Sequence, residues 1–68
     1  MTIDEFWAQV KGLPDIAMVQ VPLVLSTTTK KKLERKTLEE AAAIVTAAID
    51  EVNHGSITTL DELINHRL

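Results

Sequence analysis

A run of basic residues is the part of this sequence whose residue types most clearly suggest binding chemistry. Positions 30–36 hold five of the seven Lys and Arg residues, with Glu34 as their one acidic neighbour: Lys30, Lys31, Lys32, Arg35 and Lys36. Five positive charges and one negative charge give the segment +4, so a chain of net charge −3 carries −7 elsewhere. Hydroxyl side chains at 26–29 precede the run, and hydroxyls, amides and lysines are the groups that contact phosphate.

Three interpretations of this basic segment stay open. The first is a solvated helix whose lysines lie favourably near its C-terminal end. The second is a contact with an acidic protein surface, and the third is a contact with nucleic acid. We rank them in that order, because no aromatic residue interrupts the run to stack on single-stranded bases.

The remaining polar residues do not form a catalytic or metal-binding pattern. The chain has no cysteine, and its two histidines, His54 and His66, lack the i, i+4 spacing of a helical zinc site. Adjacent carboxylates on a helix point about 100° apart and do not converge on one substrate atom. Such pairs occur at four places: Asp4–Glu5, Glu39–Glu40, Asp50–Glu51 and Asp61–Glu62. We therefore predict no enzyme activity, no catalytic residue, no cofactor and no metal.

Length and composition predict one small domain over residues 1–68. Hydrophobic residues make up 46% of the chain, yet only Phe6 and Trp7 are aromatic. The longest apolar stretch, 16–25, is interrupted by Gln20 and Pro22 and is too short to cross a bilayer as a helix. Because the first residues are acidic, a secretory signal is not expected, and we predict a cytoplasmic protein that does not bind membranes.

Capping boxes predict three helix starts. In this motif a Thr hydroxyl accepts from the amide three residues later, where a Glu stands. The motif occurs at Thr2/Glu5, Thr37/Glu40 and Thr59/Glu62, each before an apolar pattern of helical spacing. A fourth, short helix is expected at about 28–35, after hydroxyl residues that suit a cap.

The first helix carries both aromatic residues on its apolar face. Ile3, Phe6, Trp7 and Val10 have i, i+3, i+4, i+7 spacing, and Gly12 and Pro14 are expected to end the helix. Both rings are expected in the core. An alternative is that one of them, Trp7 before Phe6, stays partly exposed as a binding anchor.

The longest helix, about 38–54, is predicted to be the central element. Its apolar stripe is rich in alanine, so another helix can approach it closely: Leu38, Ala41, Ala42, Val45, Ala48, Ile49 and Val52, widened by Ile44. Gly55 is placed to end this helix as its C′ residue. The short helix after Thr59 cannot be stable alone and must dock, most simply on this stripe.

Segment 16–25 is the least determined part of the chain. It is rich in β-branched residues, and helix or irregular chain is favoured over strand, because a lone strand would have to pair across a dimer. The predicted fold class is therefore mainly all-α, a compact bundle of about four short helices. Segment 16–25 is the one part of the chain for which an extended conformation stays open.

Two stretches resemble parts of known small bacterial proteins. Residues 48–57 resemble the C-terminal element of the omega subunit of RNA polymerase, and residues 3–10 its opening helix. Residues 51–63 are similar to the helix, glycine and capped-helix ending of toxin–antitoxin antitoxins. The arginine-rich signature of the omega family and the ribbon–helix–helix of the antitoxins have no counterpart here. Both resemblances imply a small accessory protein without chemistry of its own.

These observations predict a non-enzymatic protein-binding or regulatory module. Its partner would be another protein or a second copy of itself, and a homodimer is expected because a core this small leaves a monomer marginally stable. The alternative is a small nucleic-acid-binding regulator that uses segment 27–36. The candidate partner-binding residues are Lys30, Lys31, Lys32, Arg35, Lys36 and Trp7.

Overall fold

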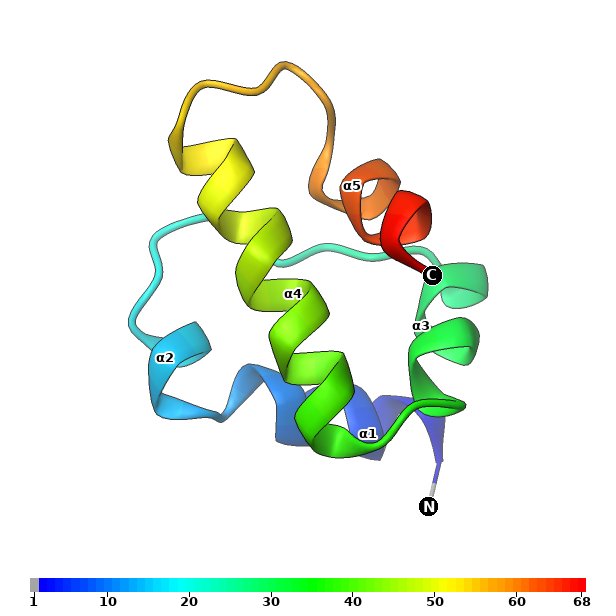
Figure 1. The fold of residues 1–68 in the computed structure, drawn as a ribbon. Coiled ribbons are helices and arrows are strands. Elements are labelled where there is room, and N and C mark those ends of the chain that lie inside the picture. The colour runs from blue at the N-terminus through cyan, green and yellow to red at the C-terminus, as the bar shows by residue number, and fades with distance from the viewer. Residues whose placement is uncertain (1) are drawn as a thin grey trace.

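In a computed structural model, which describes residues 2–68, helices surround one long central helix (Figure 1). The helices are α1 (Ile3–Lys11), α2 (Pro14–Ala17), α3 (Thr27–Glu34), α4 (Leu38–Asn53) and α5 (Leu60–Arg67). α4 contacts each of the other four. Within the described residues there is no strand, so the predicted mainly all-α class is confirmed.

The three predicted Thr caps are present. In each, the Thr hydroxyl oxygen accepts a hydrogen bond from the amide of the Glu three residues later: Thr2–Glu5 (3.1 Å), Thr37–Glu40 (3.1 Å) and Thr59–Glu62 (3.3 Å). Ser26 caps α3 in the same way and accepts from the Thr29 amide at 3.3 Å. Each cap satisfies an amide that a helix start leaves without an intrahelical partner.

The first helix ends at Gly12 as expected, but Pro14 has a second effect. It stands at the first position of α2, where the fixed φ of proline suits a helix and its missing N–H costs nothing. The chain thus begins a new short helix at the residue expected only to end the previous one.

α4 ends in the predicted glycine turn. Gly55 adopts a φ of 89°, in the left-handed region that residues with a Cβ rarely occupy. The Ser56 amide donates to the Glu51 carbonyl at 3.2 Å, and the Gly55 amide donates to the Val52 carbonyl at 3.1 Å. This pair of bonds is a Schellman motif, which closes the helix and turns the chain toward α5.

The core gathers around the predicted alanine-rich stripe of α4. Ala41, Val45 and Ala48 are fully buried, and Ile49 is 3% exposed. The other helices and the link before α3 supply the rest of the core: Phe6, Trp7, Val10, Ile16, Leu25, Leu33, Leu60 and Ile64. The small Ala side chains let neighbouring helices pack close to the α4 backbone, so the centre of the stripe is covered within one chain.

Segment 16–25 is partly helical and otherwise irregular, the outcome favoured over a strand. Ile16 is buried within α2, and residues 18–26 then run without helix or strand from α2 to α3. Leu25 is buried near the end of this link, whereas Met18 and Val24 are 84% and 78% exposed. The segment therefore covers the core with one side and exposes apolar side chains on the other.

Candidate functional site

Helix α3 divides the basic run between two sides of the molecule. Thr29 and Leu33 are fully buried and fix which side of α3 faces the core. Lys30 consequently faces α1, where its Nζ lies 3.9 Å from Asp4 Oδ1 and its side chain is 23% exposed. Lys31 is exposed, as are the remaining basic residues of the run. Lys30 is therefore the basic residue of the run least available to a partner.

The other three basic residues surround an open depression, here called the basic depression. Lys32, Arg35 and Lys36 line it together with Leu68, and its volume is about 350 Å³. Their i, i+3, i+4 spacing places the three cations on one side of α3 and of the turn after it. No acidic side chain lines the depression. Its chemistry therefore suits a negatively charged group.

A polar network between α3 and α5 holds this side of the molecule in place. The Ser26 amide and hydroxyl donate to Asp61 Oδ1 at 3.0 and 3.2 Å. Asn65 Nδ2 donates to the buried Thr29 hydroxyl at 2.7 Å, and Lys32 Nζ donates to Asn65 Oδ1 at 3.3 Å. α5 thus orients one of the three cations directly.

This network was missed by the sequence analysis. Ser26 and Thr29 were identified only as cap material and as phosphate-contact hydroxyls, and nothing in the sequence of α5 marks Asp61 and Asn65 as their partners. The hydrogen-bonded partners on the α3 side and on α5 are more than 30 residues apart in the chain; Ser26 and Asp61, for example, are separated by 35 positions. The one available signal was that a buried hydroxyl needs a partner.

Asp61 makes this network sensitive to pH. Partial burial raises the pKa of Asp61, but hydrogen bonds from the Thr29 side chain and from the Ser26 amide and hydroxyl outweigh that effect, so the pKa lies below its ordinary value of 3.8. The folded state then binds fewer protons than the unfolded chain. Stability from Asp61 is present above the unfolded pKa and is lost as the pH falls through the folded one.

We expect Asp61→Asn to destabilise the protein by about 1 kcal/mol at neutral pH, a value reduced because the network is partly solvated. The difference from the wild-type protein should shrink as the pH falls below about 4, because the unfolded chain is protonated first and the folded wild-type carboxylate follows as the pH falls through its lowered pKa. Urea unfolding between pH 7 and pH 3 measures both effects. Glu62→Gln changes the same charge in the same helical turn and should show a smaller loss; equal losses would assign the effect to the helix dipole instead.

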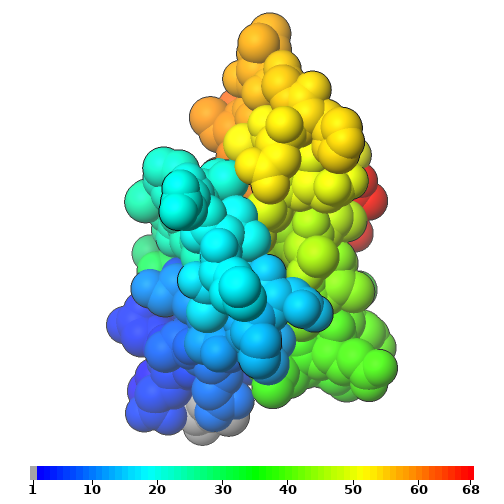
Figure 2. Space-filling model, turned by 90° about the vertical axis from the view of Figure 1, so that its left-hand side faces the viewer, coloured from blue at the N-terminus to red at the C-terminus, as the bar shows by residue number. Residues whose placement is uncertain are grey.

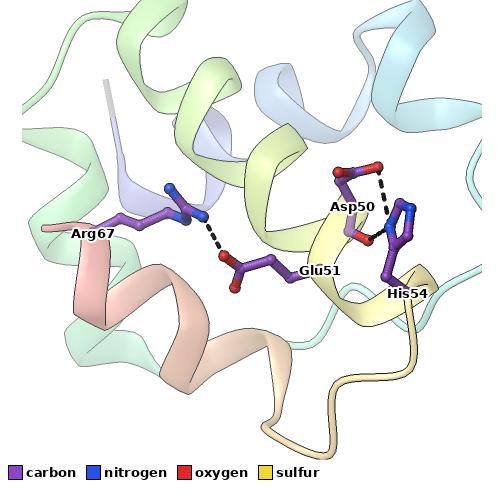
Figure 3. Close-up of polar contacts among 4 residues, drawn as sticks. All are labelled: Asp50, Glu51, His54 and Arg67. Atoms are coloured by element: carbon purple, nitrogen blue, oxygen red, sulfur yellow. Dashed lines mark hydrogen bonds and ion pairs between the residues drawn. The ribbon is translucent and has the colours of Figure 1, made fainter.

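The two histidines lie at the surface. His54 Nδ1–H donates to the Asp50 carbonyl oxygen at 2.7 Å and lies 3.6 Å from Asp50 Oδ1 (Figure 3). This hydrogen bond, and then the negative charge of Asp50, raise the pKa of His54 above its ordinary value of 6.5. Both contacts are with Asp50, one helical turn earlier, so the interactions of His54 stay within the end of α4.

An ion pair between Glu51 and Arg67 joins α4 to the last turn of α5 (Figure 3). It lies at the end of α5 that also carries Leu68, and so supports the part of the chain beside the basic depression. Within residues 2–68, no group of three or more His, Asp or Glu side chains is placed to hold a metal ion.

Trp7 lies in the core and is not an exposed anchor. The residue is 5% exposed, which confirms the expectation that its ring belongs to the core. The alternative that Trp7 stays partly exposed is therefore wrong. Three residues of the α1 stripe are buried together, namely Phe6 at 7% exposure, Trp7 and Val10, whereas Ile3 at its start is half-buried.

Comparisons with protein families, curated proteins and solved structures returned no match for this chain. The two resemblances noted above therefore rest on the quoted residues alone. None of the helices in the described part of the chain combines the length and the apolar character needed to cross a bilayer.

Proposed function

We propose that this chain is a small non-enzymatic protein-binding module that docks an acidic protein surface at the basic depression. The observation that carries the proposal is the arrangement of Lys32, Arg35 and Lys36 around a concave surface without an acidic lining residue. Cations that neighbour one another repel, and a carboxylate-rich partner relieves that repulsion.

An acidic protein suits the molecule better than nucleic acid does. Outside segment 30–36 the chain carries −7, which repels a long polyanion such as a DNA duplex more than a compact acidic patch. Both aromatic side chains are buried, so neither offers a ring on which single-stranded bases stack. Nucleic-acid binding through 27–36 remains the alternative, and the experiment below distinguishes it.

Binding of a 20-residue poly-glutamate peptide, measured by fluorescence anisotropy over a range of salt concentrations, tests this proposal. We expect affinity to fall as salt rises, and Arg35→Gln/Lys36→Gln to weaken binding by about tenfold, mainly through slower association. These two residues are chosen because both are exposed, so their replacement should change stability by under about 0.5 kcal/mol.

The matched control is Lys11→Gln/Lys30→Gln, which lowers the net charge equally but removes cations on or facing α1. It should retain most of the affinity. Equal losses of affinity in the two variants would mean that net charge alone controls binding. That result would contradict a site at the basic depression. Sub-micromolar binding of a DNA duplex or an RNA strand at physiological salt would favour the nucleic-acid alternative instead.

A further inference from the structure

The side-chain amide of Asn65, on α5, has both of its ends engaged. Asn65 Nδ2 donates to the Thr29 hydroxyl oxygen at 2.7 Å and to the Asp61 carbonyl oxygen at 3.1 Å. The reversed amide would set its oxygen against the Asp61 carbonyl oxygen, where two acceptors repel, so these contacts fix which end of the amide faces which neighbour. Asn65 Oδ1 therefore faces Lys32 Nζ, at 3.3 Å.

Thr29 gives this amide a fixed point of attachment. Its side chain is fully buried, and its hydroxyl oxygen also lies 3.0 Å from Ser26 Oγ, at the start of α3. An acceptor that is held inside the protein orients its donor more firmly than a solvated one does. A chain of contacts thus runs from the buried side of α3, through Asn65, to the ammonium group of Lys32.

The contact with Asn65 leaves the positive charge of Lys32 uncompensated. Lys30, by comparison, lies 3.9 Å from the carboxylate of Asp4. Lys32 meets a neutral carbonyl oxygen instead, and it lines the basic depression. A lysine on a free stem loses rotamer freedom when it binds, whereas a lysine held by a hydrogen bond has lost part of that freedom beforehand. Lys32 is therefore a cation that is both held and fully charged.

We propose that Asn65 is the positioning residue of the basic depression: it holds the Lys32 ammonium group for a carboxylate of the partner without neutralising it. The inference rests on the proposed function, because it assigns a role in the binding of that acidic partner. An amide suits this role better than an acid does, since a carboxylate at the same place would pair with Lys32 and compete with the carboxylates of the partner.

A double-mutant cycle between Asn65 and Lys32 tests this role. The affinity for the 20-residue poly-glutamate peptide is measured by fluorescence anisotropy for the wild-type protein, the two single variants and the double variant. We expect Lys32→Gln to weaken binding about fivefold and Asn65→Ala about threefold. In the Lys32→Gln background, Asn65→Ala should have almost no further effect, because no ammonium group is left to hold. Two effects that simply multiply would mean that Asn65 supports the fold as a whole, and would overturn the proposal.

Lys31 supplies the matched control for this cycle. It is exposed and adjoins Lys32 in the chain, but it is not among the residues that line the basic depression. Lys31→Gln removes the same charge and should weaken binding by less than about twofold. Asn65→Ala should cost the same factor in affinity whether or not Lys31 is replaced. Coupling of Asn65 to Lys31 as strong as its coupling to Lys32 would contradict the proposal.

Asn65→Asp separates the size of the side chain from its charge. It sets a carboxylate beside Lys32, so the affinity should fall at least as far as in Asn65→Ala. Asn53→Asp is its control, because it lowers the net charge equally from an exposed position at the end of α4. Figure 2 shows the end of α4 (yellow) facing the viewer, whereas the C-terminal residues (red) appear only at the edge.

Asn53→Asp should change the affinity by less than about twofold, since its charge is screened from the basic depression. Wild-type affinity in Asn65→Asp would overturn the requirement for a neutral group. Urea unfolding of Asn65→Ala should remain cooperative, because the Thr29 hydroxyl keeps its contact with Ser26. Asn65→Asp gives a second cycle with Lys32→Gln, of the same design and with the same expected coupling.

The outcomes separate this inference from the proposed function. If the wild-type protein does not bind poly-glutamate, the proposed function fails and the role of Asn65 fails with it. If the peptide binds and Arg35→Gln/Lys36→Gln weakens that binding, but neither cycle couples residue 65 to Lys32, only the role of Asn65 is overturned.

Discussion

Replacement of Ala48 by Asp is expected to abolish cooperative unfolding of this protein. Ala48 is fully buried on the face of α4 that forms the centre of the core. A carboxylate there would lose its hydration, and no cationic side chain belongs to the surrounding core cluster. The cost of several kcal/mol is comparable to the whole stability of a domain this small. Urea and thermal unfolding followed by circular dichroism would show a gradual loss of helix in place of a sigmoidal transition.

The control is Thr46→Asp, two residues earlier on the same helix. Thr46 is exposed, and its hydroxyl donates to the Ala42 carbonyl of the same helix at 2.7 Å. The substitution introduces the same charge as Ala48→Asp, and Thr and Asp have similar helix propensities. It should therefore cost about 0.5 kcal/mol and keep the transition cooperative. If the two variants behaved alike, the assignment of the buried face of α4 would be wrong.

Trp7→Ala should destabilise the protein by about 3 kcal/mol or more, the second-largest effect expected here. The indole is 5% exposed and is the largest side chain in a core that otherwise consists mostly of Ala, Val, Ile and Leu. Its removal costs both the hydrophobic transfer of the ring and the cavity left behind. Denaturant unfolding measures the loss, and the variant is expected to be marginally folded at room temperature.

Gln9→Ala provides the comparison on the same helix, because Gln9 is exposed and alanine favours helix formation. Its free energy of unfolding should stay within about 0.5 kcal/mol of the wild-type value. A loss below about 1 kcal/mol in Trp7→Ala would contradict the core position of the ring. In that case, Trp7 would again be a candidate for contact with a partner.

The sequence by itself determined the four longer helices and the buried face of the longest one. A cap such as Thr37–Glu40 joins groups three residues apart, so its signal is contained in the local sequence. Ala41 and Ala48 belong to a stripe whose period matches the helix, and burial of that stripe follows for any fold that keeps α4. Gly55 ends α4 because only glycine takes the required positive φ without strain.

The path of residues 13–26 was less accessible to such reasoning. Pro14 both ends a helix and suits the first turn of the next one, and local sequence does not choose between these two roles. The irregular link that follows is stabilised by burial of Leu25 against distant helices. Its conformation depends on the surface it covers, so propensity alone left helix, irregular chain and strand open.

Only the tertiary structure decided which basic residues can act together. The sequence showed five cations in one run, but the run is divided because burial of Thr29 and Leu33 fixes the rotation of α3. That rotation turns Lys30 toward Asp4 on α1 and leaves Lys32, Arg35 and Lys36 around one depression. The contacts that hold this arrangement join residues far apart in the chain, such as Ser26 and Asp61. Local spacing carries no information about such pairs, because they form only when packing of the core brings α3 and α5 together.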